Sequence, residues 1–255
     1  MNFFTPERIE KTRALAQDGK PFIFDDGDMR TLHFNEQVVQ SAMRLSTPDE
    51  LVIPYTQAMA GFVSLHSAPQ HILMIGLGGG SLAKYCYRHY PAARITALES
   101  NTDVLALRDQ FMIPPDDARL QVLHADAVVY LEKLAIGSVD VILLDGFDAE
   151  GAPPTLRSHA FLHYCKMVLS DRGILIVNMG DQQENIVGTV MQGQLVFGAF
   201  HYWWFKLPTD NSHIAVAVYA DDDESSEALL RTTALKVAEQ CSPELVYPKN
   251  ARSEY

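Results

Sequence analysis

The stretch from His71 to Glu99 limits most strongly what this chain can fold into. It opens with an apolar run, residues 72–75, of the length typical of a fully buried parallel strand. A helix-compatible pattern over residues 81–89 and a second apolar strand over 95–98 follow, and that strand ends in Glu99. Between the first strand and the helix the chain carries a dense glycine turn, which lets the backbone bend tightly and approach a ligand closely. Its glycines are Gly76, Gly78, Gly79 and Gly80.

This order of strand, glycine turn, helix, strand and acid is typical of a mononucleotide-binding unit. The glycines admit the ligand, and Glu99 is placed to accept hydrogen bonds from two ribose hydroxyls, about 20 residues after the glycines. A turn that only packs the helix against the strand is the alternative. The dinucleotide pattern G-x-G-x-x-G is incomplete because Ser81 stands at the third glycine's place. The G-x-G-x-G spacing of Gly76, Gly78 and Gly80 is complete and resembles the first motif of S-adenosylmethionine-dependent enzymes.

Composition and charge are those of an ordinary globular protein, with 47% hydrophobic and 20% charged residues. At 255 residues the chain holds one sizeable core with room for a small appendage. The formal net charge of -12 disfavours nucleic acid and anionic membranes as partners. It would suit a cationic small molecule, but acidity that serves solubility alone is the favoured explanation. No apolar run approaches the ~18 residues that cross a bilayer. The charged N-terminal stretch has no signal-peptide core, so we expect a cytoplasmic protein.

The cysteines give no sign of a disulfide framework or a metal site. Cys86, Cys165 and Cys241 are odd in number, lie far apart and form no C-x-x-C spacing. We therefore expect reduced, mostly buried thiols and no metal ion.

The chain is expected to divide into a small N-terminal β-hairpin and helix region (1–66), a Rossmann-like nucleoside-binding catalytic domain (67–222) and a C-terminal helix and tail (223–255). In the first region, residues 21–24 and 29–34 read as a hairpin around a turn at Asp25-Asp26-Gly27-Asp28. Helices are expected over 36–45 and 55–66, the second one begun by Pro54.

From His71 onward strands and helices alternate, which predicts a parallel sheet. The expected second, third and fourth strands of this region end at or next to Glu99, Asp126 and Asp145. Parallel strands place their carboxyl ends at one edge of the sheet, so these three acids should converge on one crevice.

The end of the catalytic domain changes character. Residues 194–205 and 214–219 are expected to be two strands joined by a turn-rich link, and such strands pair antiparallel. A parallel α/β sheet finished by an antiparallel hairpin is the layout of the class I S-adenosylmethionine-dependent methyltransferase-like fold, which the chain resembles. An amphipathic helix is expected over 224–240.

Between about Phe22 and Tyr219 the chain resembles the polyamine aminopropyltransferases, the spermidine and spermine synthases. The family's G-G-G-D-G loop is similar to residues 76–80, and its ribose-binding acid to Glu99. Its G-D-[GA] motif, which holds the adenine amino group, is similar to Ala125-Asp126-Ala127. The most specific match is the catalytic D-S-S-D-P-x-G-P loop, which resembles the residues DGFDAEGA from Asp145 onward.

The resemblance implies aminopropyl transfer from decarboxylated S-adenosylmethionine to an amine such as putrescine, by a homodimer and without a metal. In the family mechanism the first acid of the catalytic loop, here Asp145, takes a proton from the attacking amine. The second acid, here Asp148, holds the far ammonium, and Gln40 matches one position of the Y-[HQ]-E gate motif. The donor would be bound by Gly76, Gly78, Gly79, Gly80, Glu99, Asp126 and Ala127.

The chain also departs from the family pattern. Gly79 replaces the aspartate that grips the donor's amino group, Val39 stands where the gate tyrosine falls, and Arg30 replaces a glutamine. The nucleoside half of the site is thus kept while the amine half is altered, and discrimination between the decarboxylated and the intact donor should be poor.

Three other functions stay open at this point. The first is a small-molecule methyltransferase that uses intact S-adenosylmethionine on the same fold. The second is a non-catalytic nucleoside-binding or dimerisation module. An NAD-dependent oxidoreductase is more distant, because the third fingerprint glycine is missing.

Overall fold

The computed structural model describes residues 5–16, 19–36, 38–199, 201–208 and 211–219. The expected helix over 224–240, the tail region 223–255 and Cys241 lie outside these residues. Cys86 and Cys165 are buried free thiols, as expected. Within the described ranges no helix combines the length and the apolar character needed to cross a bilayer.

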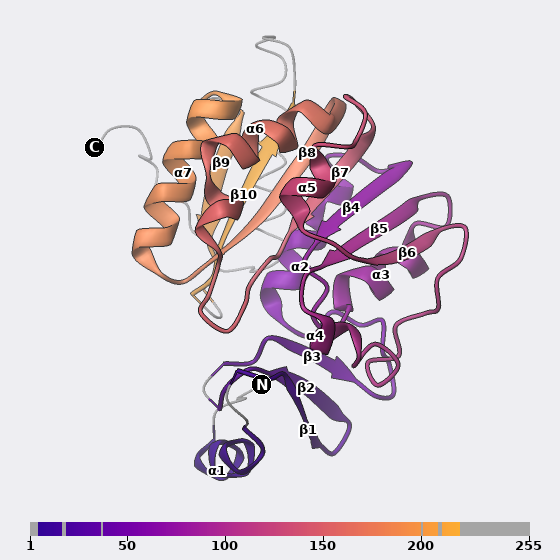
Figure 1. Ribbon diagram of the computed structural model, residues 1–255, viewed down its shortest axis with the longest axis vertical. Coiled ribbons are helices and arrows are strands. Elements are labelled where there is room, and N and C mark those ends of the chain that lie inside the picture. The colour runs from indigo at the N-terminus through magenta and orange to yellow at the C-terminus, as the bar shows by residue number, and fades with distance from the viewer. Residues whose placement is uncertain (1–4, 17–18, 37, 200, 209–210, 220–255) are drawn as a thin grey trace.

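A seven-stranded sheet forms the centre of the molecule (Figure 1). Its strand order is β6-β5-β4-β7-β8-β10-β9, in which the first five strands run parallel and β10 and β9 are antiparallel to their neighbours. This confirms the expected α/β fold with an antiparallel hairpin at one edge. The strands are β4 (His71–Ile75), β5 (Arg94–Glu99), β6 (Leu120–His124), β7 (Val139–Leu144), β8 (Leu169–Gly180), β9 (Tyr202–Lys206) and β10 (His213–Val218).

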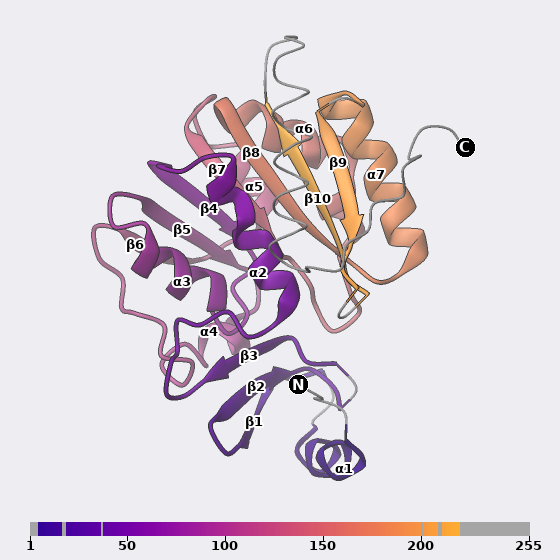
Figure 2. The same cartoon turned by 180° about the vertical axis from the view of Figure 1, so that it is seen from behind.

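The two faces of the sheet bury separate hydrophobic clusters. In β4, Ile72 and Met74 belong to the cluster on one face, while Leu73 and Ile75 belong to the cluster on the other. This alternation explains why the strand is apolar throughout: both of its faces are covered. The first face carries α2 (Pro54–Ala60), η1 (Gly61–Ser64), α3 (Ser81–His89) and α4 (Thr102–Leu105), and the second α5 (Ala127–Leu131), η2 (Pro154–Arg157), α6 (His159–Val168) and α7 (Gln183–Phe197) (Figures 1 and 2).

A second, three-stranded antiparallel sheet lies beside the carboxyl ends of the parallel strands (Figure 1). It consists of β1 (Phe22–Asp26), β2 (Met29–His33) and β3 (Ser41–Arg44). The hairpin of β1 and β2 was expected, but the helix over 36–45 was wrong, because β3 pairs with β2 from Ser41↔Leu32 to Arg44↔Met29. Ala, Met and Arg favour helices, yet pairing and burial in a sheet outweigh so weak a preference.

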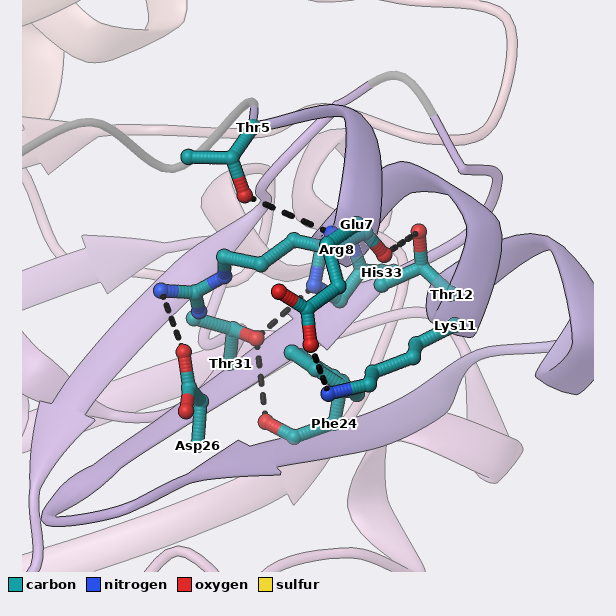
Figure 3. Close-up of polar contacts among 9 residues, drawn as sticks. All are labelled: Thr5, Glu7, Arg8, Lys11, Thr12, Phe24, Asp26, Thr31 and His33. Carbon is teal, nitrogen blue, oxygen red and sulfur yellow. Dashed lines mark hydrogen bonds and ion pairs between the residues drawn. The ribbon is translucent and has the colours of Figure 1, made fainter.

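Helix α1 (Pro6–Leu15) packs on the small sheet (Figure 3). The Thr5 side chain caps the helix by accepting a hydrogen bond from the N–H of Arg8. Arg8 in turn pairs with Asp26 at 3.1 Å and lies over the ring of Phe24. Beneath the helix, the Thr31 hydroxyl lies 2.8 Å from Nε2 of His33, and burial lowers the pKa of this histidine. These contacts tie the N-terminal segment to the small sheet.

The expected strand over 194–205 is correct only in its second half. Residues 194–197 are the last turn of α7, and Gly198, with φ of 90°, ends that helix before β9 begins at Tyr202. The aromatic run then divides: Tyr202 is buried in the core, whereas Trp204 is 46% exposed on the edge strand.

Candidate active site

The glycine turn, residues 76–80, lies at the point where the strand order reverses. From β4, the chain continues to β5 and β6 on one side and later to β7 and β8 on the other. Ligands of open α/β sheets bind in the crevice at such a point. Gly76 has φ of 95°, and a Cβ there would lie 2.2 Å from the backbone oxygen of Asp145. The close approach of β4 and β7 therefore requires glycine at this position.

Glu99 is bound to the glycine turn. Its carboxylate accepts hydrogen bonds from the N–H groups of Leu77 at 3.1 Å and Gly78 at 3.4 Å, and from Asn101 at 2.9 Å. The strand-end acid and the glycine turn, joined by hydrogen bonds from Leu77 and Gly78, which are 22 and 21 residues away in sequence, thus form one unit in space. Because a carboxylate has about four lone-pair positions, a ligand hydroxyl can still bind beside these donors.

Asp145 follows β7 and is hydrogen-bonded on both carboxylate oxygens. The hydroxyl of Tyr55 donates to Oδ2 at 3.2 Å, and the amide of Asn178 donates to Oδ1 at 2.9 Å. Burial raises the pKa of Asp145, with a smaller contribution from the charge of Glu99, while the two hydrogen bonds oppose the rise. A carboxyl held in place with a raised pKa is suited to proton transfer near neutral pH.

Tyr55 and Asn178 are the site residues that the sequence reasoning missed. Asn178 stands near the end of β8, one strand beyond β7, so the rule that placed Asp145 at the crevice could have found it. Tyr55 lies in the first turn of α2, 90 residues before Asp145, and only the packing of that helix brings it to the crevice.

Asp148 lies at the exposed tip of the loop that follows Asp145. The N–H of Asp148 donates to the Gly151 oxygen at 2.9 Å, and its carboxylate accepts from the N–H of Glu150 at 2.8 Å. Two more exposed acids, Asp181 and Glu184, follow the end of β8 at the same edge of the sheet. The edge of the sheet beyond β7 and β8 is therefore acidic, which favours a cationic ligand.

Three predicted positions remain, Asp126, Ala127 and Gln40, and they lie in two other segments. Asp126 is exposed and caps α5 by accepting a hydrogen bond from the Val129 N–H at 3.0 Å, and Ala127 is the buried first residue of that helix. Gln40 comes directly before β3; its N–H donates to the Leu32 oxygen at 2.8 Å. Among the described residues no hydrogen bond joins Gln40 to Asp145 or Asp148, whereas Tyr55 donates to Asp145.

Gly79 is enclosed by side chains from two other segments. A Cβ at this residue would lie 2.6 Å from the Ser41 hydroxyl oxygen and 2.8 Å from Cδ1 of Phe111. Gly79 is not among the glycines with positive φ, so what restricts a larger residue here is space and not backbone strain. The place of a side chain at position 79 is thus filled by Ser41 and Phe111.

Acids dominate the site, but within the described ranges no three histidine, cysteine or acidic side chains are placed to hold a metal ion together.

Comparison with known proteins bears directly on this site. The model of the spermine/spermidine synthase domain matches residues 52–228. The chain belongs to the spermine/spermidine synthase family. This match includes the glycine turn, the strand-end acids and Tyr55, and it confirms the resemblance found in the sequence. The chain is accordingly a transferase.

The related proteins include two polyamine aminopropyltransferases and one methyltransferase. A polyamine aminopropyltransferase of Neisseria meningitidis is 39% identical over 214 residues, 80% of this chain and 77% of that protein. The polyamine aminopropyltransferase of Chromobacterium violaceum is 38% identical over 157 residues, 61% of this chain and 60% of the relative. The human eEF1A lysine and N-terminal methyltransferase is 29% identical over 136 residues, but these are only 20% of that protein.

Solved structures share the fold. A probable spermidine synthase from Corynebacterium glutamicum superposes with a TM-score of 0.69 at 20% identity, covering 87% of this chain and 90% of that one. A spermidine synthase in complex with the transition-state analogue AdoDATO gives 0.65 at 18% identity, covering 83% and 76%. Human methyltransferase-like protein 13, in complex with SAH, gives 0.60 at 23% identity, covering 78% and 97%. Spermidine synthases and methyltransferases thus share the architecture of this chain.

Proposed function

We propose that the protein is a polyamine aminopropyltransferase that transfers an aminopropyl group from decarboxylated S-adenosylmethionine to a small amine such as putrescine. The observation that carries the proposal is the carboxyl group of Asp145, which Tyr55 and Asn178 orient beside the glycine turn. The names of the family's curated members support the same reaction.

On this proposal the nucleoside of the donor lies over the carboxyl ends of β4, β5 and β6. Gly76, Gly78, Gly79 and Gly80 allow its close approach, and Glu99 binds the ribose hydroxyls. Asp126 and the backbone of Ala127 bind the adenine amino group. The exposed position of Asp126 beside α5 is compatible with this role, because its capping bond to Val129 uses only one carboxylate oxygen.

The acceptor amine lies on the side of β7 and β8. It reaches the site as an ammonium ion and gives its proton to Asp145, and the freed nitrogen attacks the carbon next to the sulfonium. A C–N bond forms, the C–S bond breaks, and the electron pair stays on sulfur, which leaves as methylthioadenosine. Asp148 holds the far ammonium of the acceptor, and Gln40 contributes to the substrate pocket.

A raised pKa serves Asp145 in this step. A carboxylate of ordinary pKa is a weak base toward an ammonium ion. Raising the pKa of Asp145 brings it closer to the pKa of the ammonium ion, which makes the proton transfer less unfavourable. The hydrogen bonds from Tyr55 and Asn178 fix the orientation of the carboxyl group, and burial raises its pKa.

A second candidate is methyl transfer from intact S-adenosylmethionine. One observation favours it: residue 79 is glycine, so no acid stands there to repel the carboxylate of the intact donor.

One experiment separates the two reactions. The purified protein is incubated with putrescine and either donor, and the products are identified by mass spectrometry. We expect methylthioadenosine and an aminopropylated amine from the decarboxylated donor. Formation of S-adenosylhomocysteine and a methylated amine from the intact donor alone would overturn the proposal in favour of the second candidate.

A further inference from the structure

Arg157, the last residue of η2, is a half-buried cation that no step of the proposed reaction uses. Its Nη2 donates to the backbone oxygen of Ala152 at 2.8 Å, and its Nη1 donates to Oδ1 of Asn185 at 2.5 Å. Ala152 belongs to the loop that follows Asp145, and Asn185 lies in the first turn of α7. Among the residues that the structure describes, no carboxylate forms an ion pair with Arg157. The guanidinium group therefore links the loop to α7 through two uncharged acceptors.

The loop end of this link lies next to the turn of Asp148. Asp148 and Gly151 exchange backbone hydrogen bonds, in which the N–H of Asp148 donates at 2.9 Å and that of Gly151 at 3.3 Å. Gly151 has φ of 116°, a conformation that residues with a side chain rarely adopt. Ala152 comes directly after Gly151, so Arg157 holds the residue at which the chain leaves the turn. The position of Asp148 thus depends on a contact of Arg157.

The helix end of the link reaches the same turn from another direction. Nδ2 of Asn185 donates to Oε1 of Gln182, the N-cap residue of α7, at 2.7 Å. The Gln182 side chain lies beside Gly151, since a Cβ at Gly151 would stand 3.8 Å from its Nε2. The side chains of Arg157, Asn185 and Gln182 together hold the turn of Asp148 against the start of α7.

The short helix that carries Arg157 also supports the beginning of the loop. A Cβ at Gly146 would lie 2.6 Å from Cδ1 of Leu156, so Leu156 packs closely on the residue after Asp145. Leu156 and Arg157 are consecutive residues of η2. The distance between Asp145 at the start of the loop and Asp148 at its tip is therefore set from one short helix.

A positive charge at this place needs a reason, because it repels the cationic ligand that the acidic edge of the sheet favours. The Nε of Arg157 is moreover buried with no hydrogen-bond partner in the part of the chain that the structure describes, which is unfavourable. The planar guanidinium group can donate in two fixed directions at once, which a lysine or a glutamine cannot do. What the arginine adds is therefore the geometry of the loop.

We infer that Arg157 is a positioning residue for the acceptor amine: it holds the turn of Asp148 at a fixed distance from Asp145, so that both nitrogens of a diamine are bound together. The inference rests on the proposed function, in which Asp145 meets the attacking nitrogen and Asp148 the far ammonium. Arg157 itself touches neither nitrogen and acts through Asp148.

The test measures transfer to putrescine at a saturating concentration of decarboxylated S-adenosylmethionine. Arg157→Gln should raise KM for putrescine about 10-fold or more, change kcat less than about 3-fold and change the affinity for methylthioadenosine less than about 2-fold. Arg119→Gln is the matched control, because Arg119 donates to the backbone oxygens of Tyr87 at 2.7 Å and Tyr90 at 3.1 Å and has a similarly buried Nε. It comes directly before β6, at the opposite ends of the parallel strands, and its loss should leave KM unchanged.

The double variant Asp148→Asn/Arg157→Gln shows whether Arg157 acts through Asp148. Asp148→Asn alone should raise KM, and Arg157→Gln should then raise it less than about 2-fold further, because the contact that Arg157 positions is already lost. If Arg157→Gln does not fold, Asn185→Ala, which removes one acceptor of the link, should raise KM in its place.

Three results would overturn the inference. They are a wild-type KM in Arg157→Gln or its substitute Asn185→Ala, a wild-type KM in Asp148→Asn, and an equal effect of Arg157→Gln with and without the carboxylate of Asp148. A wild type that forms no aminopropylated product contradicts the proposed function itself, and with it the inference.

Discussion

The hydroxyl of Tyr55 lies 3.2 Å from Oδ2 of Asp145. This contact joins α2, which precedes the parallel strands in sequence, to the loop at the end of β7. It brings the helix that packs across β8 and β10 next to Asp145, so a segment from before the glycine turn lies beside the loop that follows β7.

Tyr55→Phe should change the pH dependence of turnover. The hydrogen bond from Tyr55 lowers the pKa of Asp145, so its loss raises that pKa further. A base must be deprotonated to act, and the acidic limb of the kcat profile should therefore move to higher pH, with kcat reduced roughly 3- to 10-fold at its optimum. Tyr87→Phe is the matched control, because Tyr87 donates to Asp117 at 2.8 Å outside the crevice. If the acidic limb of the kcat profile lies at the same pH in Tyr55→Phe as in wild type, Tyr55 does not influence the pKa of the base.

Glu99→Gln should weaken both nucleoside binding and the glycine turn itself. The carboxylate accepts three backbone hydrogen bonds, and an amide nitrogen in its place would face N–H donors. We expect the binding of methylthioadenosine to weaken by about 1–3 kcal/mol and the melting temperature of the free protein to fall. Calorimetry and thermal melting measure the two effects. Glu10→Gln, on the exposed side of α1, should change neither. Unchanged binding in Glu99→Gln would exclude this residue from the donor site.

Gly79→Ala should destabilise the protein by about 1–3 kcal/mol, because its methyl group would overlap Ser41 and Phe111. Gly188→Ala is the control, since no atom lies within 4 Å of a Cβ there and α7 should gain stability or stay unchanged. Equal free energies of unfolding for the two variants in urea denaturation would show that Ser41 and Phe111 move aside at little cost. For the same steric reason, Gly79→Asp should improve donor discrimination only when Ser41 or Phe111 is made smaller.

The stability of wild type relative to Lys84→Met should rise with pH. The pKa of Lys84 is about 7 in the folded state and 10.5 in the reference state, so between these values the unfolded chain binds a proton that the folded one does not. The wild type therefore gains up to about 1.4 kcal/mol of unfolding free energy per pH unit above 7, and the methionine variant lacks this gain. Urea denaturation at pH 6, 7.5 and 9 measures the difference. A constant difference would mean that the buried ammonium keeps its ordinary pKa.

The central fold could be predicted from sequence because its signals are local. The apolar strands and the glycine turn lie within one continuous stretch, and the acids at the strand ends follow from parallel topology alone. Asp145 and Glu99 were placed at the crevice for that reason. The sequence also showed that glycine replaces the family's aspartate at position 79. It did not show that Ser41 and Phe111 leave no room for a side chain there, because these residues lie 38 positions before and 32 positions after Gly79.

The remaining parts depend on contacts between distant segments. Residues 41–44 have helix-forming side chains and become a strand only because β2 offers a partner. The end of α7 carries residues that also suit a strand, and Gly198 sets the boundary that the apolar pattern does not reveal. Tyr55 could not be assigned to the site from spacing, since nothing within α2 marks the residue that will meet Asp145.

The most direct test of the proposed role of Asp145 is a comparison of Asp145→Asn with wild type, using decarboxylated S-adenosylmethionine and putrescine. Product formation in a single turnover and the affinity for methylthioadenosine are measured on the same preparations. Removal of the base should slow transfer by about 10² to 10⁴ and leave the affinity for methylthioadenosine within about 3-fold of wild type. Transfer at the wild-type rate in Asp145→Asn would contradict the proposal and leave Asp145 a structural residue held by Tyr55 and Asn178.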